Sequence, residues 1–484
     1  MVLSGGRGSE RQGERMYRYS MTVNGTQRRD GEGTLPVRDP ATGQVCGEVP
    51  QCSPPVLDEA MEAARLAGPS WSKDEAARRD CLRRLADALH ANRDELAAIV
   101  TAEQGKPLPD ARTEVDRAAQ WLGYYADVEM TPQVLRDGSG ERVVAERRPL
   151  GVVAAITPWN SPVMLACWKL GPALRAGNTV VLKPSPFTPL STLRMGELLA
   201  PALPAGVLNV ISGGDRLGAL MSEHPIPRKV SFTGSVATGK KVALAAAADL
   251  KRVTLELGGN DPAIILDDAD PAKIADALFW SAFRNCGQVC SAVKRIYAPG
   301  RLYESVVAGL SERARSVRVG PGTQPGVQLG PISNRPQFDR VSELVADARD
   351  RRARVAAGGE PIAGTGNFYQ PTILAGLSSG ARVVDEEQFG PVLPVVAYDS
   401  LDDAVEQANA THFGLSASVW GGEPGRVAEV ARALEAGRVG ANVHPGIGPD
   451  LPFGGWKRSG IGVENGLPGL LEFTQMQVVF QESA

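Results

Sequence analysis

Val152-Val153-Ala154-Ala155-Ile156 opens the stretch 152–257, in which short apolar runs alternate with helix-like segments. Two of these segments are Thr188–Ala202 and Val236–Leu250. Such alternation is typical of a parallel sheet with right-handed crossovers and helices on both faces. The stretch therefore predicts a doubly wound α/β domain. The runs expected as buried strands are Val152–Ile156, Thr179–Leu182, Leu208–Ile211, Val230–Thr233 and Val253–Leu257.

A second alternating block follows the glycine-rich bridge Glu256-Leu257-Gly258-Gly259-Asn260. Its expected helix is Pro271–Phe283, and its expected strands are Ala263–Leu266, Ala292–Ala298, Phe389–Tyr398 and Ser416–Trp420. We therefore expect the α/β fold class with two doubly wound parallel-sheet domains. The bridge would place Glu256 at a strand end, facing the crevice where open parallel sheets bind their ligands.

Three segments outside these blocks also carry structural signals. Ala76–Thr101 is an amphipathic helical region, and Gly105-Lys106-Pro107 is a plausible stop for it. After the turn signal Asp137-Gly138 we expect a strand at Arg142–Arg147, and the apolar Met476–Phe480 predicts another near the end. Residues 1–20 lack an apolar signal core, so we expect a polar, flexible leader there.

The bulk composition excludes several classes of protein. The chain has 484 residues, 43% hydrophobic and 22% charged, with a formal net charge of -3. This balance gives no electrostatic footprint for nucleic acid or an anionic membrane, and no apolar run is long enough to span a bilayer. Six scattered cysteines and four distant histidines suggest neither a disulfide framework nor a metal site. We expect a cytoplasmic protein of two or three domains without a bound metal.

Three residues supply the parts for covalent attack on a carbonyl. Cys290 closes the run Phe283–Cys290, Glu256 precedes two glycines, and Asn160 sits in Ile156–Pro162. A thiolate is a nucleophile, a carboxylate can activate water, and an amide can stabilise an oxyanion. Each also has an ordinary structural interpretation: a buried cysteine, a strand-end ion pair and a turn residue.

In this order the three motifs resemble the NAD(P)-dependent aldehyde dehydrogenase superfamily. The similarity runs from about Val23 to Val479 and includes Pro452–Gly460. It implies oxidation of an aldehyde to a carboxylic acid through a thiohemiacetal and then a thioester on Cys290. In that scheme Asn160 stabilises the oxyanion, and Glu256 activates the water that hydrolyses the thioester.

The same resemblance implies a division of the chain. A Rossmann-like NAD(P)-binding domain would comprise residues 21–126 and 150–257, and a catalytic domain residues 258–470. Residues 127–149 and 471–484 would form a small antiparallel oligomerisation arm, in which the chain end pairs with a neighbour's sheet. The expected assembly is a homodimer or homotetramer.

NAD or NADP is the cofactor that the resemblance implies. Phe232–Gly239 matches the family's phosphate loop, although no GxGxxG follows the first strand. Pro186 stands where many NAD-preferring relatives have an acidic residue, so use of NADP is open. The residues implied in cofactor binding are Thr157, Trp159, Lys183, Ser185, Gly213, Gly218, Gly234, Ser235, Leu257, Glu387 and Phe389.

Substrate identity is less constrained by the sequence. The residues expected to shape the aldehyde pocket are Met164, Trp168, Val289, Ser291 and Phe453. Met164 and Trp168 could equally be core residues, and no cluster of arginines demands a charged substrate. Leu467 stands where some relatives carry a proton-relaying carboxylate. Cys286, which we place one helical turn before Cys290, is expected to pack rather than to form a disulfide.

Three alternative functions stay open at this point. One is a coenzyme A-acylating semialdehyde dehydrogenase, which Glu256 disfavours because such relatives lack this base. Another is a thioester or ester hydrolase that moves no hydride. The third is a catalytically retired binding protein, against which the joint presence of Cys290, Glu256 and Asn160 argues.

Overall fold

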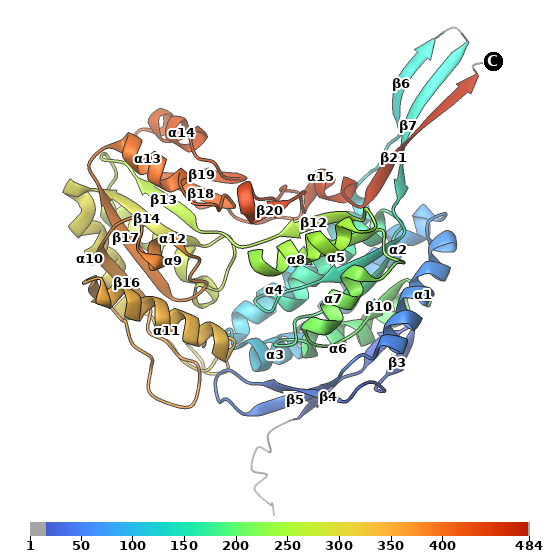
Figure 1. The fold of residues 1–484 in the computed structure, drawn as a ribbon, viewed down its shortest axis with the longest axis horizontal. Helices are drawn as coiled ribbons and strands as arrows, with labels where there is room; N and C mark the ends of the chain where they lie inside the picture. Colours follow the sequence, from blue (N-terminus) through green and yellow to red (C-terminus); the bar gives the residue numbers. More distant parts are fainter. Residues whose placement is uncertain (1–15, 139, 483–484) are drawn as a thin grey trace, which may run out of the picture.

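The computed structural model describes residues 16–138 and 140–482. The stretch 152–257 forms the centre of an eight-stranded sheet (Figure 1). Every residue of the strands that begin at Val152, Thr179 and Lys229 is buried, as in parallel sheets covered on both faces. The strands of this sheet are β2 (Met21–Val23), β3 (Thr26–Arg28), β8 (Val152–Ile156), β9 (Thr179–Lys183), β10 (Leu208–Val210), β11 (Lys229–Thr233), β12 (Arg252–Glu256) and β20 (Gly460–Ile461).

The strand order is β20-β12-β11-β8-β9-β10-β2-β3, and neighbours from β12 to β10 run parallel. The chain starts at β8, moves outward through β9 and β10, and returns to the other side through β11 and β12. Its switch point therefore lies between β8 and β11, and a ligand crevice is expected at their carboxyl ends. Glu256, the last residue of β12, lies on this edge, as predicted.

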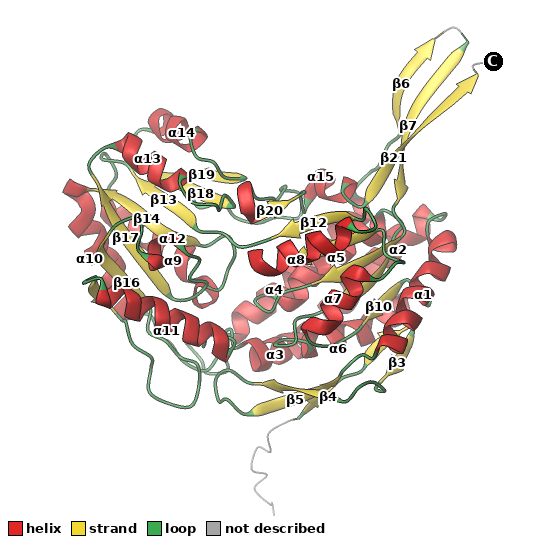
Figure 2. Cartoon of the chain, in the orientation of Figure 1, coloured by secondary structure: helices red, strands yellow, loops and turns green. Residues whose placement is uncertain are grey.

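Helices cover both faces of this sheet (Figure 2). Helices α5 and α6 pack together and are backed by α2, α3 and α4, whereas α7 packs on α8. The helices are α1 (Pro54–Trp71), α2 (Glu75–Ala91), α3 (Arg93–Gln104), α4 (Leu108–Asp127), α5 (Pro162–Arg175), α6 (Leu190–Leu199), η1 (Ala200–Ala202), α7 (Asp215–Glu223) and α8 (Val236–Ala247).

The region predicted as one helical stretch, Ala76–Thr101, is two helices, α2 and α3. They meet at Asn92, whose side-chain amide donates to the Ala88 carbonyl at 2.8 Å. Asparagine competes for backbone groups in this way, and the chain leaves helical geometry there. The stop is confirmed: α3 ends at Gln104, and Gly105 follows with a φ of 97°.

The second block forms a seven-stranded sheet in the described residues, in the order β15-β16-β17-β14-β13-β18-β19. Ala263 and Ile265 belong to one hydrophobic cluster and Ile264 to another, so the alternating side chains of a strand fill two cores. The strands are β13 (Asp261–Ile265), β14 (Val293–Pro299), β15 (Arg354–Ala357), β16 (Thr372–Leu377), β17 (Val392–Tyr398), β18 (Ser416–Trp420) and β19 (Arg438–Ala441). The helices that follow residue 270 in the chain are α9 (Pro271–Phe283), η2 (Arg284–Gly287), α10 (Gly300–Ser316), α11 (Arg335–Asp350), α12 (Arg382–Asp385), α13 (Leu401–Asn409), α14 (Pro424–Arg432), η3 (Lys457–Ser459) and α15 (Gly466–Leu471); the last of them packs on α5.

The segment 258–470, predicted as the catalytic domain, is not one continuous structural unit. Its strand β20 pairs antiparallel with β12, where Leu255 faces Ile461 and Glu256 faces Gly460. The chain thus returns to the first sheet before residue 470, and it does so beside the predicted catalytic base.

An antiparallel arm projects from the body of the molecule (Figure 1). Its strands are β6 (Gln133–Gly138), β7 (Glu141–Pro149) and β21 (Thr474–Glu482). They lie in the order β21-β7-β6, so the chain end pairs with β7 of its own chain and forms an edge of this sheet.

The leader is shorter than predicted. Residues 1–15 lie outside the described residues, but β1 (Tyr17–Arg18) pairs with β5 (Val45–Pro50), which also pairs with β4 (Thr34–Arg38). The Tyr17 and Tyr19 rings stack at 6.2 Å. The Ser20 N–H donates to Glu197 at 2.8 Å. Ring stacking and hydrogen bonding therefore fix residues 17–20, which composition alone assigned to a flexible leader.

Candidate active site

The loop that carries Cys290 is a tight turn after α9. Gly287 has a φ of 73°, and a Cβ there would lie 2.2 Å from the Gly390 carbonyl oxygen, so glycine is required. Asn285 and Cys286 also have positive φ values, of 51° and 60°. Cys286 is therefore not one helical turn before Cys290, as we had placed it. We call the parts built around the eight-stranded and the seven-stranded sheet the first and second lobes. Cys286 packs in a core of the second lobe, as predicted, and burial raises the pKa of its thiol to about 12.

Lys294 holds this loop from behind. Its ammonium donates to the carbonyls of Val289 at 2.6 Å and of Cys290 at 3.1 Å. Lys294 also lies 3.9 Å from the Glu387 carboxylate. Lys294 was not among the predicted site residues, although a lysine at the start of the buried strand Ala292–Ala298 is a signal that could have found it.

Cys290 and Glu256 meet at the junction of the two lobes. Cys290 is partly exposed, Glu256 is 4% exposed, and the two side chains lie within electrostatic range of each other. Burial raises the pKa of Glu256 well above its usual value, and the nearby Glu464 carboxylate raises it further. Burial also raises the pKa of Cys290, and the charge of Glu256 acts in the same direction. The resting pair is thus poised to hold protons rather than charges.

Asn160 reaches the same loop from the other lobe. It lies between β8 and α5, is 5% exposed, and donates one amide N–H to the Gln288 carbonyl at 3.0 Å. The amide nitrogen carries two hydrogens, so one donor remains for a ligand. The three residues predicted as catalytic are therefore brought together by elements that are far apart in sequence.

A buried ion pair lies beyond Glu256. The Lys169 ammonium contacts Glu464 at 2.6 Å and Thr233 at 2.8 Å, and Lys169 is fully buried. Leu467 lies on α15 and is 44% exposed, whereas Glu464, which precedes that helix, is the acid near Glu256.

Aromatic rings build the wall beside Cys290. Trp168 stacks on Trp121 at 5.5 Å and meets Phe453 edge-on at 5.3 Å. Met164, Trp168 and Phe453 are buried in the large core against which Cys290 packs, so they are core residues. Val289 and Ser291 adjoin Cys290 in the chain, and the Ser291 carbonyl lies 2.6 Å from His444 Nε2.

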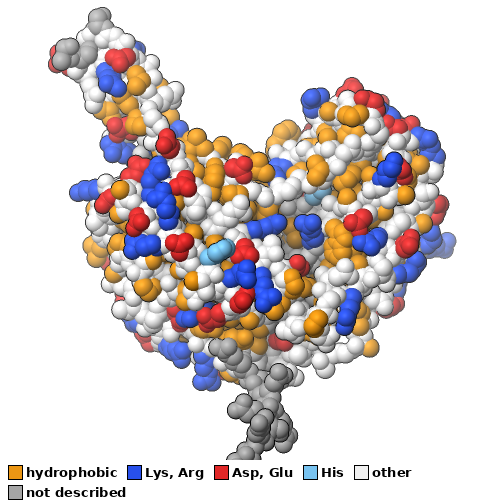
Figure 3. Space-filling view, turned by 180° about the vertical axis from the view of Figure 1, so that it is seen from behind, with side chains coloured by type: hydrophobic (Ala, Val, Ile, Leu, Met, Phe, Trp, Pro, Cys, Tyr) orange, Lys and Arg blue, Asp and Glu red, His pale blue; other side chains and the backbone are white. Residues whose placement is uncertain are grey.

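Arginines that are distant in sequence come together near this wall. Arg117, on α4, lies one helical turn from Trp121 and within electrostatic range of Arg284. Burial lowers the pKa of Arg117, and the charge of Arg284 lowers it further. Neither guanidinium forms an ion pair within 4.0 Å in the described part of the chain. Arg438 stacks over Phe453 at 5.0 Å and is electrostatically coupled to Cys290. The closeness of Arg117 and Arg284 was not visible in the sequence, where they lie 167 positions apart. Figure 3 shows the surface notched between the lobes.

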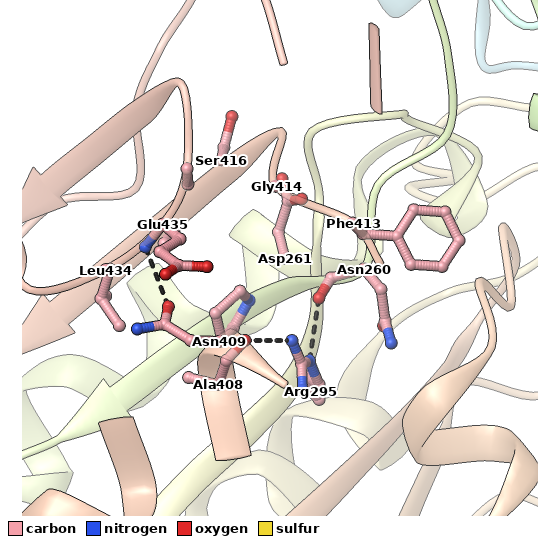
Figure 4. Close-up of a pocket in the computed structure, with 13 residues that line it drawn as sticks. Asn260, Asp261, Arg295, Ala408, Asn409, Phe413, Gly414, Ser416, Leu434 and Glu435 are labelled. Atoms are coloured by element: carbon pink, nitrogen blue, oxygen red, sulfur yellow. Dashed lines mark hydrogen bonds between the residues drawn. The ribbon is translucent and has the colours of Figure 1, made fainter. Parts of the chain in front are cut away.

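A small cavity lies beneath the glycine-rich bridge (Figure 4), with a volume of about 10 Å³. This is room for roughly one water molecule and not for a substrate. The Arg295 guanidinium beside it donates to the Asn260 carbonyl at 2.9 Å and to the Ala408 carbonyl at 2.7 Å. Arg295 therefore anchors the bridge that follows Glu256.

Comparison with known proteins decides the family. The model of the aldehyde dehydrogenase family matches residues 27–479. The chain belongs to the aldehyde dehydrogenase family. The resemblance and fold class expected from the sequence are thereby confirmed, and so is the reaction class, the oxidation of an aldehyde with NAD or NADP.

Individual relatives cover nearly the whole chain. The succinate-semialdehyde dehydrogenase (NADP(+)) of Escherichia coli strain K12 is 37% identical over 472 residues, covering 96% of this chain and 97% of that protein. The 3-sulfolactaldehyde dehydrogenase of Pseudomonas putida is 37% identical over 456 residues, with 93% and 94% covered. The NAD+ complex of an aldehyde dehydrogenase from Bacillus cereus superposes with a TM-score of 0.94 at 35% identity, with 96% of each chain covered.

The residues expected to hold the dinucleotide of this dehydrogenase gather at the carboxyl ends of β8, β9, β11 and β12. Thr157 follows β8, and its buried hydroxyl has no hydrogen-bond partner among the described residues. Lys183 ends β9, where burial lowers its pKa to about 8 and its ammonium donates only to the Pro184 carbonyl. Ser185 follows, with its hydroxyl accepting from Phe187 N–H at 3.3 Å. Unpartnered polar groups of this kind fit a polar cofactor.

Groups on the second lobe face these strand ends. Trp159 and Phe389 meet edge-on at 5.2 Å, which joins the two lobes by an aromatic contact. Glu387 accepts the Gly259 N–H at 3.1 Å. A Cβ on Gly258 would lie 2.2 Å from the Glu387 carboxylate, so glycine leaves the space that this carboxylate uses. Burial raises the pKa of Glu387.

The remaining predicted cofactor residues have mixed placements. Gly234 donates its N–H to the Glu256 carbonyl at 3.0 Å, and Ser235 caps α8 by accepting from Thr238. Gly213 precedes α7, but Gly218 lies inside α7, where its missing Cβ leaves open space toward Ile156. Leu257 packs on Gly239 at the start of α8. These positions shape the turn before α8 and the faces of α7 and α8.

In the described residues no helix is long and apolar enough to cross a membrane, and no group of His, Cys, Asp or Glu has the arrangement of a metal site.

The raised pKa of Cys290 has a measurable consequence. The thiolate is the reactive form, so alkylation of the cofactor-free enzyme by iodoacetamide should accelerate with pH, with a midpoint above the usual thiol value of 9.0. Glu256→Gln removes a nearby negative charge and should lower that midpoint. A midpoint below 8 in the unaltered protein would contradict the buried, acid-paired environment.

Proposed function

We propose that Cys290 is the nucleophile, Glu256 the general base and Asn160 the oxyanion donor of an aldehyde dehydrogenase that releases a carboxylic acid. The observation that carries this proposal is the closeness of the Cys290 thiol to the buried Glu256 carboxyl, with the Asn160 amide bound to the same loop. A nucleophile, a base and an oxyanion donor within reach of one another are what acyl chemistry requires.

The first half of the reaction forms a covalent adduct. Cys290 loses its thiol proton to solvent, and the resulting thiolate adds to the aldehyde carbon. The negative charge that develops on the aldehyde oxygen is stabilised by the free Asn160 N–H and by the Cys290 backbone N–H. When bound, the nicotinamide of the cofactor supplies the hydride acceptor. Lys183, Thr157 and Glu387 are the groups placed to hold the dinucleotide.

The second half regenerates the enzyme. The thioester on Cys290 is attacked by water, and Glu256 accepts the proton of that water. Its raised pKa makes it a stronger base than an ordinary carboxylate. The carbon–sulfur bond then breaks, the carboxylic acid leaves, and Cys290 regains a proton. A coenzyme A-acylating enzyme would need no such base, so Glu256 favours water as the acyl acceptor, and product analysis with and without coenzyme A distinguishes the two.

Substitutions at the two central residues should separate the half-reactions. Cys290→Ala should abolish oxidation, because no other described thiol adjoins Glu256. Glu256→Gln should still acylate but turn over slowly, giving a burst of reduced cofactor followed by a steady state lowered by about 10²–10⁴-fold. Stopped-flow absorbance of NAD(P)H measures both phases. Full steady-state turnover by Glu256→Gln would exclude it as the base.

We also propose that the aldehyde is anionic. Arg117 and Arg284 lie close enough to repel each other, and the Asp110 carboxylate acts on both and offsets part of that repulsion. Neither arginine forms an ion pair within 4.0 Å among the described residues. A carboxylate or sulfonate on the substrate would relieve that repulsion. Two relatives are named for such aldehydes, a succinate semialdehyde and 3-sulfolactaldehyde. NADP is the favoured cofactor, because Pro186 removes a carboxylate that would repel a 2′-phosphate.

Arg284→Gln should therefore raise KM for a carboxylate-bearing aldehyde by about 10–100-fold, the range for a lost charge-assisted hydrogen bond. The KM for a neutral aldehyde of similar length should not change. Arg335→Gln, an exposed arginine on α11, is the matched control. Initial rates over an aldehyde panel with NAD and with NADP test both inferences. Equal KM changes for neutral and anionic aldehydes would rule out the charge contact.

We propose that the arm joins copies of this chain. Met476, Val478 and Phe480 alternate along β21, so they share a face, and they are 52%, 41% and 67% exposed. Val134 and Leu135 on β6 are also exposed. An exposed apolar edge of this kind is a liability unless another strand or surface covers it. A homodimer or homotetramer would cover it.

Phe480→Asp combined with Met476→Asp should lower the mass in solution to that of a smaller assembly, measured by light scattering. Leu66→Asp, which alters a 63% exposed leucine on α1, is the control and should leave the mass unchanged. An unaltered mass for the arm variant would place the contact elsewhere.

We further infer a reducing location such as the cytoplasm. All six cysteines are free thiols, and Cys290 must stay reduced to act as a nucleophile.

A further inference from the structure

A buried ion pair lies directly behind the loop that carries Asn160. Lys106 follows α3 and Glu114 lies on α4; they are 5% and 4% exposed, and the Lys106 ammonium contacts Glu114 Oε2 directly. The attraction within a buried pair is largely offset by the loss of hydration, so such a pair is a poor source of net stability. Its contacts outside the pair indicate another role.

Each partner of the pair holds a different end of the Asn160 segment. The Lys106 ammonium donates to the Asn160 carbonyl at 2.9 Å and to the Ser161 hydroxyl at 3.4 Å. Glu114 Oε1 accepts the N–H groups of Val163 at 2.9 Å and Met164 at 3.3 Å, in the first turn of α5. The pair thus ties the loop and the helix that follows it to α4.

The nucleophile loop is attached to the same carbonyl. Asn285 Nδ2 donates to the Asn160 carbonyl at 3.0 Å, and Asn285 Oδ1 accepts from Gln104 at 3.2 Å. The Asn160 side chain in turn donates to the Gln288 carbonyl. The backbone and side chain of Asn160 are therefore fixed to the chain on either side of Gly287, and Lys106 fixes them to the first lobe.

We propose that the Lys106–Glu114 pair positions Asn160 as the oxyanion donor. This inference rests on the catalytic role proposed above for Asn160. An oxyanion donor must lie about 2.7–3.1 Å from the developing charge, and a displacement of 1 Å can lower a rate by about 100-fold. Asn160 lies in an irregular segment between β8 and α5, so its backbone needs such external support. Lys106 and Glu114 are positioning residues that do not touch the substrate.

The test variant replaces both charges, Lys106→Met with Glu114→Gln. Removing both avoids a lone buried charge, and glutamine still accepts the N–H groups of α5. The burst rate of cofactor reduction should fall about 10–100-fold, while the Kd for NADP, measured by fluorescence titration, should not change. Glu114→Gln alone is a second, milder variant that keeps the ammonium on the Asn160 carbonyl. Lys273→Met, an 82% exposed lysine, is the matched control.

A double-mutant cycle separates positioning from general weakening of the fold. If the pair acts through Asn160, adding the paired replacement to Asn160→Ala should cost little beyond Asn160→Ala alone. Full additivity of the two losses, or an unchanged burst rate in the paired variant, would overturn the proposal. If Asn160→Ala itself leaves the burst rate unchanged, the catalytic role of Asn160 fails, an outcome distinct from failure of the positioning role.

Discussion

The approach of the Cys290 thiol to the buried Glu256 carboxyl is the contact on which the rest of the site depends. Both groups are held in surroundings that disfavour their charged forms. These surroundings keep the Cys290 nucleophile neutral at rest and place the Glu256 carboxyl beside it. The same carboxyl then serves the water that releases the product.

The two lobes supply opposite halves of that contact. Glu256 ends β12 in the first sheet, whereas Cys290 lies on a loop of the second lobe, and the junction is held by few but specific contacts. Trp159 meets Phe389 across it, Asn160 reaches the Gln288 carbonyl, and β20 returns from the second block to pair with β12. Because β20 pairs beside Glu256, the path of the chain itself joins the second lobe to the base.

The sequence predicted the parts with strong local patterns and missed the parts set by distant contacts. Buried strands such as Val152–Ile156 and Ser416–Trp420 were found with their observed bounds, because an apolar run between turns is a local signal. The break at Asn92 was missed because amphipathic spacing continues across it. Lys294, Lys106, Glu114 and the pair of Lys169 with Glu464 were also missed, since their meaning lies in which backbone carbonyl or carboxylate each meets in space. The grouping of Arg117 with Arg284 depends on tertiary packing in the same way.

The most direct measurement is mass spectrometry of the Glu256→Gln enzyme quenched after mixing with an aldehyde and NADP. If the thioester forms on Cys290 and hydrolysis stalls, the peptide that contains Cys290 should carry the mass of one acyl group, matched in amount to the burst of reduced cofactor. A burst of reduced cofactor with Cys290 unmodified, or with the acyl group on another residue, would contradict covalent catalysis by Cys290.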